Sequence, residues 1–272
     1  MLYAALIADL VNSRRFSIGE RERIQKLLKV CLEKLNRVFR QALQFDVVFS
    51  AGDEVQGLFI SPQAAFLYAR LLRLFLAPVQ IRCGIGVGQW EVKIARGTSS
   101  EQDGAAYHRA RSAIAAVKAG TVIDSAGEGD LYINALLGAS SLLAAEQSYY
   151  QQQITLLSEL VFPLCQKQMD LKAFGDLGEL FAGKIASESA AQAKRLKRLE
   201  LEPVALEAFD LAALENAAVA LPIWKKGFST KLAARAGTSR QNMDRLLRAA
   251  KIVELRNIDA VSWRFMAQRL GG

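Results

Sequence analysis

The alternation of strand-like and helix-like patterns over residues 2–87 constrains the fold most. Residues 2–8 read LYAALIA, an apolar run of strand length, and residues 17–42 repeat apolar side chains at helical spacing. The patterns that follow are strand, strand, helix and strand, over residues 45–50, 55–60, 62–76 and 79–87. This order, βαββαβ, predicts a ferredoxin-like sheet. The whole chain is therefore expected to be of the α/β (α+β) class, with an all-α C-terminal half.

The predicted topology brings acidic residues together. A right-handed crossover makes the first two strands parallel, and the third strand then lies between them, antiparallel to the first. The end of the first strand, at Asp9, should therefore lie beside the turn that carries Asp53 and Glu54. Carboxylates are ligands that Mg²⁺ prefers, so we expect Asp9 and Asp53 to bind Mg²⁺, with Glu54 as a third candidate ligand. The alternative is ordinary turn chemistry at Gly52-Asp53.

Polar and basic residues near these carboxylates are candidates for contact with a nucleotide or its phosphates. They are Asn12, Ser13, Arg14, Arg15, His108 and Arg111. The first four lie between Asp9 and the first helix, where side chains and helix N-terminal amides can bind phosphate. The alternative for them is a basic surface loop, and for the only histidine it is a structural role.

Three glycines alternate within the strand over residues 79–87 and just beyond it. Gly84, Gly86 and Gly88 therefore share one face of the strand. A glycine-lined face indicates close approach by a helix or a ligand.

These residues resemble two known families. A strand that ends in Asp, a Gly-Asp hairpin and a strand that ends in GIGVG are similar to the palm of class III nucleotidyl cyclases and diguanylate cyclases. This resemblance implies that Asp9 and Asp53 bind the metals that activate a nucleoside triphosphate. The segments IADLVNSRRF and DGAAYHRARSAI (103–114) together resemble the SatD family. The cyclase pair of Asn and Arg, four residues apart on the following helix, is missing here, which favours nucleotide binding over turnover.

The excess of positive over negative charge lies mostly in the last third of the chain. The net charge is +8; residues 184–272 hold 16 Lys and Arg against 9 Asp and Glu, whereas residues 1–183 hold 19 against 18. A basic segment of this kind predicts an acidic partner, and DNA is the commonest one. The alternative is a solvated basic surface.

The second half contains two patterns typical of a helix-turn-helix. We expect a palm domain over residues 1–130, a helical domain over 131–203 with a first candidate pair, and a C-terminal helix-turn-helix domain over 204–272. In the second pair, Gly237 makes the turn and Thr238 or Ser239 caps the second helix. Residues 258–265 are a candidate wing strand.

Side chains at the start of that second helix are the types that read base edges. The predicted base readers are Arg240, Gln241, Asn242 and Arg245. Predicted phosphate contacts are Lys231 and Arg248, and in the first pair Lys194, Arg195, Lys197 and Arg198.

A reduced, cytoplasmic protein is the simplest interpretation. The three cysteines are odd in number and far apart, the N-terminus lacks signal-peptide features, and charges interrupt every apolar run before it could cross a bilayer. We therefore predict no membrane partner.

Three functions stay open. The sequence favours a DNA-binding transcriptional regulator whose palm domain binds a nucleotide or metal-nucleotide. The alternatives are an active Mg²⁺-dependent nucleotidyl cyclase or nucleotidyltransferase that uses Asp9 and Asp53, and a scaffold with protein-binding helices. The oligomeric state stays open too, although both resemblances allow a homodimer.

Overall fold

The N-terminal half forms the predicted βαββαβ unit. The structure is a computed structural model that describes all residues except 1, 95, 187–206, 215–225 and 271–272. Its first six regular elements are β1 (Tyr3–Leu10), α1 (Ile18–Val38), β2 (Leu43–Ala51), β3 (Glu54–Phe59), α2 (Pro62–Leu76) and β4 (Ile81–Gly88). Helix α3 (Ala105–Ala116) and strand β5 (Gly120–Asp124) follow. The mixed α/β class with a helical C-terminal half is confirmed.

The sheet has the strand order β2-β3-β1-β4-β5. Strand β3 lies between β1 and β2 and is antiparallel to both, as the crossover rule predicts. Strand β4 pairs antiparallel with β1, and β5 extends the sheet parallel to β4. The end of β1 and the start of β3 therefore share one edge of the sheet, where Ala8 pairs with Val55.

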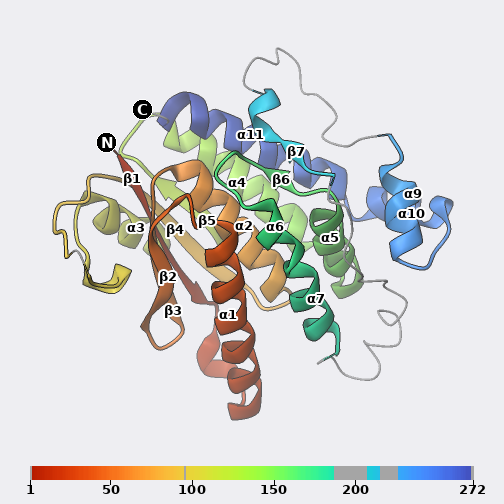
Figure 1. Cartoon of the computed structure of the whole chain (residues 1–272), viewed down its shortest axis with the longest axis horizontal. Helices are drawn as coiled ribbons and strands as arrows, with labels where there is room; N and C mark the ends of the chain where they lie inside the picture. Colours follow the sequence, from red (N-terminus) through yellow and green to blue (C-terminus); the bar gives the residue numbers. More distant parts are fainter. Residues whose placement is uncertain (1, 95, 187–206, 215–225, 271–272) are drawn as a thin grey trace.

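The two faces of the sheet are covered by different helices (Figure 1). In β1, Leu6 belongs to the core shared with α1 and α2, whereas its neighbours Ala5 and Ile7 belong to a smaller cluster with α3. This alternation is the period of two that a strand imposes. Helix α1 begins at a capping box, in which Ser17 Oγ accepts from the Glu20 amide and the Ser17 amide donates to Glu20 Oε2.

The alternating glycines of β4 lie directly against α3. A Cβ built at Gly86 would be 2.1 Å from both the Ala106 carbonyl oxygen and the Ala110 nitrogen, and one at Gly84 would be 2.3 Å from the Ala110 oxygen. A side chain at either position would overlap the helix backbone. Of the two explanations that the sequence left open, a helix and not a ligand explains these glycines.

The second half of the chain is mainly helical and packs on the first. Its elements are α4 (Asp130–Ala145), α5 (Tyr149–Val161), β6 (Leu164–Cys165), α6 (Leu171–Gly175), α7 (Leu177–Ala186), β7 (Phe209–Asp210), α9 (Phe228–Arg235), α10 (Arg240–Ala249) and α11 (Ile252–Leu270). Helix α11 contacts both α4 and α2, so the end of the chain returns to the N-terminal half (Figure 1). The candidate wing at residues 258–265 is wrong, because these residues lie inside α11. Their apolar side chains at helical spacing, such as Ala260 and Trp263, are buried.

A buried charge cluster joins the two halves. Arg70 of α2 donates to Glu159 of α5 and to Asp259 of α11, and Arg256 of α11 also donates to Glu159. All four side chains are at most 5% exposed. Two cations and two anions thus neutralise one another where water is excluded, which is the condition for burying charge.

Among the described residues, none of the helices combines the length and the apolar character that a bilayer span needs.

Candidate functional site

The predicted metal ligand Asp9 is held by an arginine. Asp9 lies near the end of β1 and pairs in register with Arg82 of β4, so the two side chains lie on the same face of the sheet. Arg82 Nε donates to Asp9 Oδ1 and Nη2 donates to Oδ2, both at 2.7 Å. This two-point geometry is the strongest form of carboxylate recognition by a single side chain. Only 17% of the Asp9 side chain is exposed.

Glu54 is paired in a similar way. It starts β3, and Arg111 of α3 donates to its Oε2 at 2.5 Å while Ser50 Oγ donates to its Oε1 at 2.8 Å. Asp53 lies in the turn before it, after Gly52 at a φ of 61°. Hydrogen bonding to Asp9 raises the pKa of Arg82, and the charges of Asp9, Glu54 and Asp53 raise it further. The topology therefore brings all three predicted acidic residues within electrostatic reach of one guanidinium.

This arrangement does not fit a Mg²⁺ ion as it stands. Magnesium requires free oxygen ligands around it, but the oxygens of Asp9 and Glu54 already accept hydrogen bonds from side chains. Within the described part of the chain, no group of three or more His, Cys, Asp or Glu side chains could hold a metal ion. Magnesium binding by Asp9, Asp53 and Glu54 stays a prediction that requires the arginines to move away.

The loop after β1 presents unpaired basic side chains. Arg14 and Arg15 form a short 3-10 turn with Ser13, and Asn12 precedes it at a φ of 58°. Both arginines are exposed, and their side chains form no hydrogen bond or ion pair with another described residue. The histidine lies apart from them on α3, 74% exposed, with Nε2 3.3 Å from Asp103 Oδ1.

Sequence reasoning missed Arg82. The signal was present, because Arg82 is the charged residue of an otherwise apolar strand, VQIRCGIGV. Extending the antiparallel register from the glycines would have placed it opposite Asp9.

Helices α9 and α10 form the predicted second helix pair. Helix α9 ends in a Schellman motif: the Gly237 amide donates to the Ala234 carbonyl and the Thr238 amide donates to the Ala233 carbonyl. Gly237 has a φ of 57°, which favours glycine. Ser239 then caps α10 by accepting from the Asn242 amide at 3.2 Å.

One side of α10 is buried and the other is polar and exposed. Met243 and Leu247 are buried. Gln241, Arg245 and Arg248, at positions i, i+4 and i+7, form an exposed stripe away from them.

The polar contacts within α10 join residues of neighbouring turns. Arg245 donates to Asn242 Oδ1 at 2.5 Å, and Arg240 Nε lies 3.7 Å from Asp244 of the next turn. The predicted phosphate contact Lys231 is in an ion pair with Glu207. Arg240, Gln241, Asn242 and Arg245 thus all lie at the exposed N-terminal part of α10.

The helix pair projects from the molecule on the side away from the sheet (Figure 1). Phe228 of α9 packs on Phe162 with ring centroids 4.7 Å apart, and the Arg256 guanidinium lies over the Phe228 ring. At the other end, Gln147 Nε2 donates to the Ala250 carbonyl at the end of α10. These contacts at its two ends attach the helix pair to the helical core, while its polar face stays exposed.

In the first candidate pair, α7 is present over Leu177–Ala186. Its expected second helix, with Lys194, Arg195, Lys197 and Arg198, lies outside the described residues.

Comparison with protein families gives a match that covers most of the chain. The sequence model described as the SatD family matches residues 3–202. No curated protein matches the chain with significance. The matched range contains the five-stranded sheet and ends before α9 and α10.

Proposed function

The chain belongs to the SatD family, and we propose that it is a DNA-binding regulator whose helix α10 enters the major groove. The observation that carries this proposal is the exposed row of Arg240, Gln241 and Asn242 at the N-terminal end of α10, the second helix of a tightly joined pair. Residues at this position of a recognition helix contact base edges.

Side-chain chemistry supports this assignment. Arg pairs with guanine through two hydrogen bonds, and Gln or Asn pairs with adenine in the same way. Arg248 on the same stripe and Lys231 on α9 would contact phosphates, which supply affinity without sequence preference. The excess of basic residues in the last third adds the long-range attraction that DNA binding requires.

A nucleotide at the edge of the N-terminal sheet is the second part of the proposal. The exposed Arg14 and Arg15 are free to contact phosphates, and Asn12 and Ser13 lie beside them. His108 and Arg111 would approach from α3. The enzymatic alternative has less support, because catalysis through Asp9 and Asp53 needs both as metal ligands, and Arg82 now occupies the oxygens of Asp9.

Fluorescence anisotropy with a labelled 30-base-pair random duplex tests the DNA assignment. Wild-type affinity should fall steeply with salt, with a slope in log K against log [salt] of about −0.9 for each phosphate contact. The double variant Arg240→Ala/Arg245→Ala should lose binding by about 10-fold or more at constant salt, because it removes two positive charges that would release counterions from the duplex.

A matched control removes the same charge elsewhere. Arg37 and Arg40 are exposed at the end of α1 and form no ion pair with a described residue. Arg37→Ala/Arg40→Ala should bind DNA like the wild type. Equal weakening by both double variants would show a general charge effect and remove the case for α10 as the recognition helix.

Thermal unfolding with nucleoside triphosphates and Mg²⁺ tests the nucleotide assignment. A nucleotide should raise the melting temperature of the wild type and should act less on Arg14→Ala/Arg15→Ala. Formation of cyclic or oligomeric nucleotide products in the same mixtures would instead support the enzymatic alternative. Stabilisation that is equal in both proteins would contradict phosphate contact by Arg14 and Arg15.

A further inference from the structure

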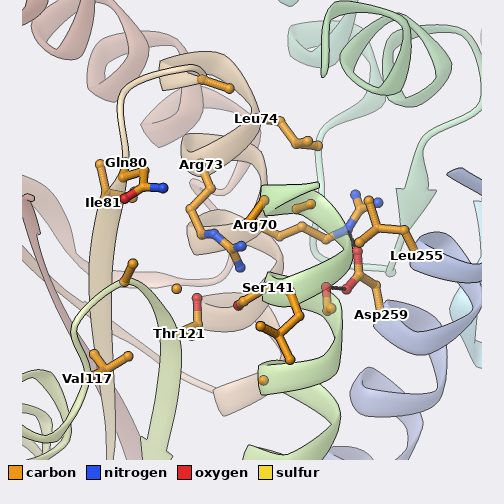
Figure 2. Close-up of a pocket in the computed structure, with 18 of the residues that line it drawn as sticks. Arg70, Arg73, Leu74, Gln80, Ile81, Val117, Thr121, Ser141, Leu255 and Asp259 are labelled. Carbon is orange, nitrogen blue, oxygen red and sulfur yellow. Dashed lines mark hydrogen bonds and ion pairs between the residues drawn. The ribbon is translucent and has the colours of Figure 1, made fainter. Parts of the chain in front are cut away.

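A cavity of about 440 Å³ lies on the face of the sheet opposite α3, at the end of the strands where β1 ends and β4 and β5 begin. Its walls come from the end of α2, the loop into β4, strand β5, helix α4 and helix α11 (Figure 2). This volume is typical of a small-molecule site. The wall is largely apolar, with Leu74, Ile81, Val117 and Leu255 among its side chains.

One lining charge has no partner. The charged residues that line the cavity are Arg70, Arg73 and Asp259. Arg70 and Asp259 neutralise each other, and Ser140 also donates to Asp259. The side chain of Arg73 forms no hydrogen bond or ion pair with any described residue, so the cavity carries one uncompensated positive charge. Figure 2 shows the Arg73 guanidinium pointing into the cavity toward Ser141 and Thr121.

Two polar atoms in the wall also lack partners among the described residues. They are Thr121 Oγ1 and Gln152 Oε1, both buried. Thr121 is 3% exposed and lies beside Cys83 across the sheet. Burial raises the pKa of Cys83 to about 12, and the nearby Thr121 hydroxyl partly lowers this pKa. The two groups nevertheless do not form a hydrogen bond. A buried hydroxyl without a hydrogen-bond partner destabilises the protein, and a hydrogen bond from it to a ligand oxygen would remove this cost.

Together these features define a ligand of one class. We propose that the cavity binds a small organic anion, with its carboxylate or phosphate on Arg73 and its apolar part against Leu74, Ile81 and Leu255. A guanidinium forms paired hydrogen bonds with either anion, and Thr121 supplies a hydroxyl group beside it. This site is separate from the α10 surface and does not depend on the DNA assignment.

The chain offers two variants that block the site in different ways. Arg73→Met removes the charge, and Arg37→Met is its matched control, because both arginines lie in the last turn of a helix. Gly138 of α4 lines the cavity, and a Cβ there would meet no atom within 4 Å. Gly138→Leu should therefore occupy cavity space without a clash, and it exchanges a poor helix former for a good one.

Titrations followed by the amide signals of Gly120 and Gly138 in ¹⁵N-labelled full-length protein provide the test. The probes are hexanoate, phenyl phosphate and the neutral hexanamide. We expect at least one anion to shift both signals at millimolar concentration. Hexanamide should bind at least about 10-fold more weakly, as the loss of one charged contact predicts. Hexanoate alone would identify a carboxylate ligand, and phenyl phosphate alone a phosphate ester.

The variants decide whether the cavity is the site. Arg73→Met should weaken anion binding about 10-fold, Arg37→Met should leave it unchanged, and Gly138→Leu should remove the Gly120 shift while the melting temperature stays at or above that of the wild type. The proposal is overturned if hexanamide binds as tightly as the anions, if Arg73→Met binds like the wild type, or if neither anion shifts the two signals at 10 mM.

Discussion

Replacing Glu159 by Gln should destabilise the protein more than any surface charge change. Glu159 of α5 is fully buried and accepts from two arginines: Arg70 at 2.7 and 2.8 Å, and Arg256. Gln keeps the shape but removes the negative charge. Two buried guanidiniums would then share one carboxylate, Asp259.

The magnitude follows from this imbalance. Removing one partner of a buried ion pair costs about 3–5 kcal/mol, because the remaining charge stays desolvated without compensation. A loss of this size corresponds to a fall in melting temperature of roughly 6–20 °C for a chain of about this length. Exposed pairs contribute less than about 1 kcal/mol. The matched control is Glu22→Gln, which breaks the ion pair with Lys26, whose side chain is 75% exposed.

Urea unfolding followed by circular dichroism measures the free energy of unfolding. Glu159→Gln should lose about 3–5 kcal/mol, whereas Glu22→Gln should unfold like the wild type. Adding Arg256→Met to Glu159→Gln restores the charge balance, so the double variant should be less destabilised than the sum of the two single variants. A loss below about 1 kcal/mol for Glu159→Gln, or strictly additive effects, would refute the view that these charges depend on one another.

Three further results are expected. Gly86→Ala should cost about 1–3 kcal/mol or more, because its Cβ would lie 2.1 Å from the α3 backbone; Gly138→Ala, where the space is open, should be neutral or stabilising in the same urea assay. Ser239→Ala should lower stability by about 1 kcal/mol through loss of the α10 cap, and an unchanged midpoint would contradict that role. Burial raises the pKa of Cys31 and Cys83 to about 12, so at pH 8 the thiolate fraction is about 10⁻⁴. Labelling by iodoacetamide should be slow in the native protein and fast in urea; fast native labelling would show that these thiols are accessible.

Much of the fold follows from local pattern. The apolar run of residues 2–8 and helical spacing after Ser17 predict β1 and α1, and the crossover rule then orders three strands without any knowledge of side-chain contacts. The turn at Gly237 and the cap at Ser239 were also predictable, because each depends on residues within one helical turn. The candidate wing failed because a short polar–apolar stretch, IDAVSWRF, fits a strand until its continuation on both sides places it in α11.

The partners of charged side chains could not be predicted from such patterns. Whether Asp9 faces a metal or Arg82 depends on a strand more than seventy positions away, and Arg70 meets Glu159 and Asp259 only because three distant helices pack together. The sequence by itself determines the hydrophobic periodicity and therefore the helices and strands. Chain connectivity then largely determines the order of the strands in the sheet. Tertiary structure alone decides which charges are neutralised and which, like Arg73, are left facing a cavity, because electrostatic energy depends on distance through space and on burial.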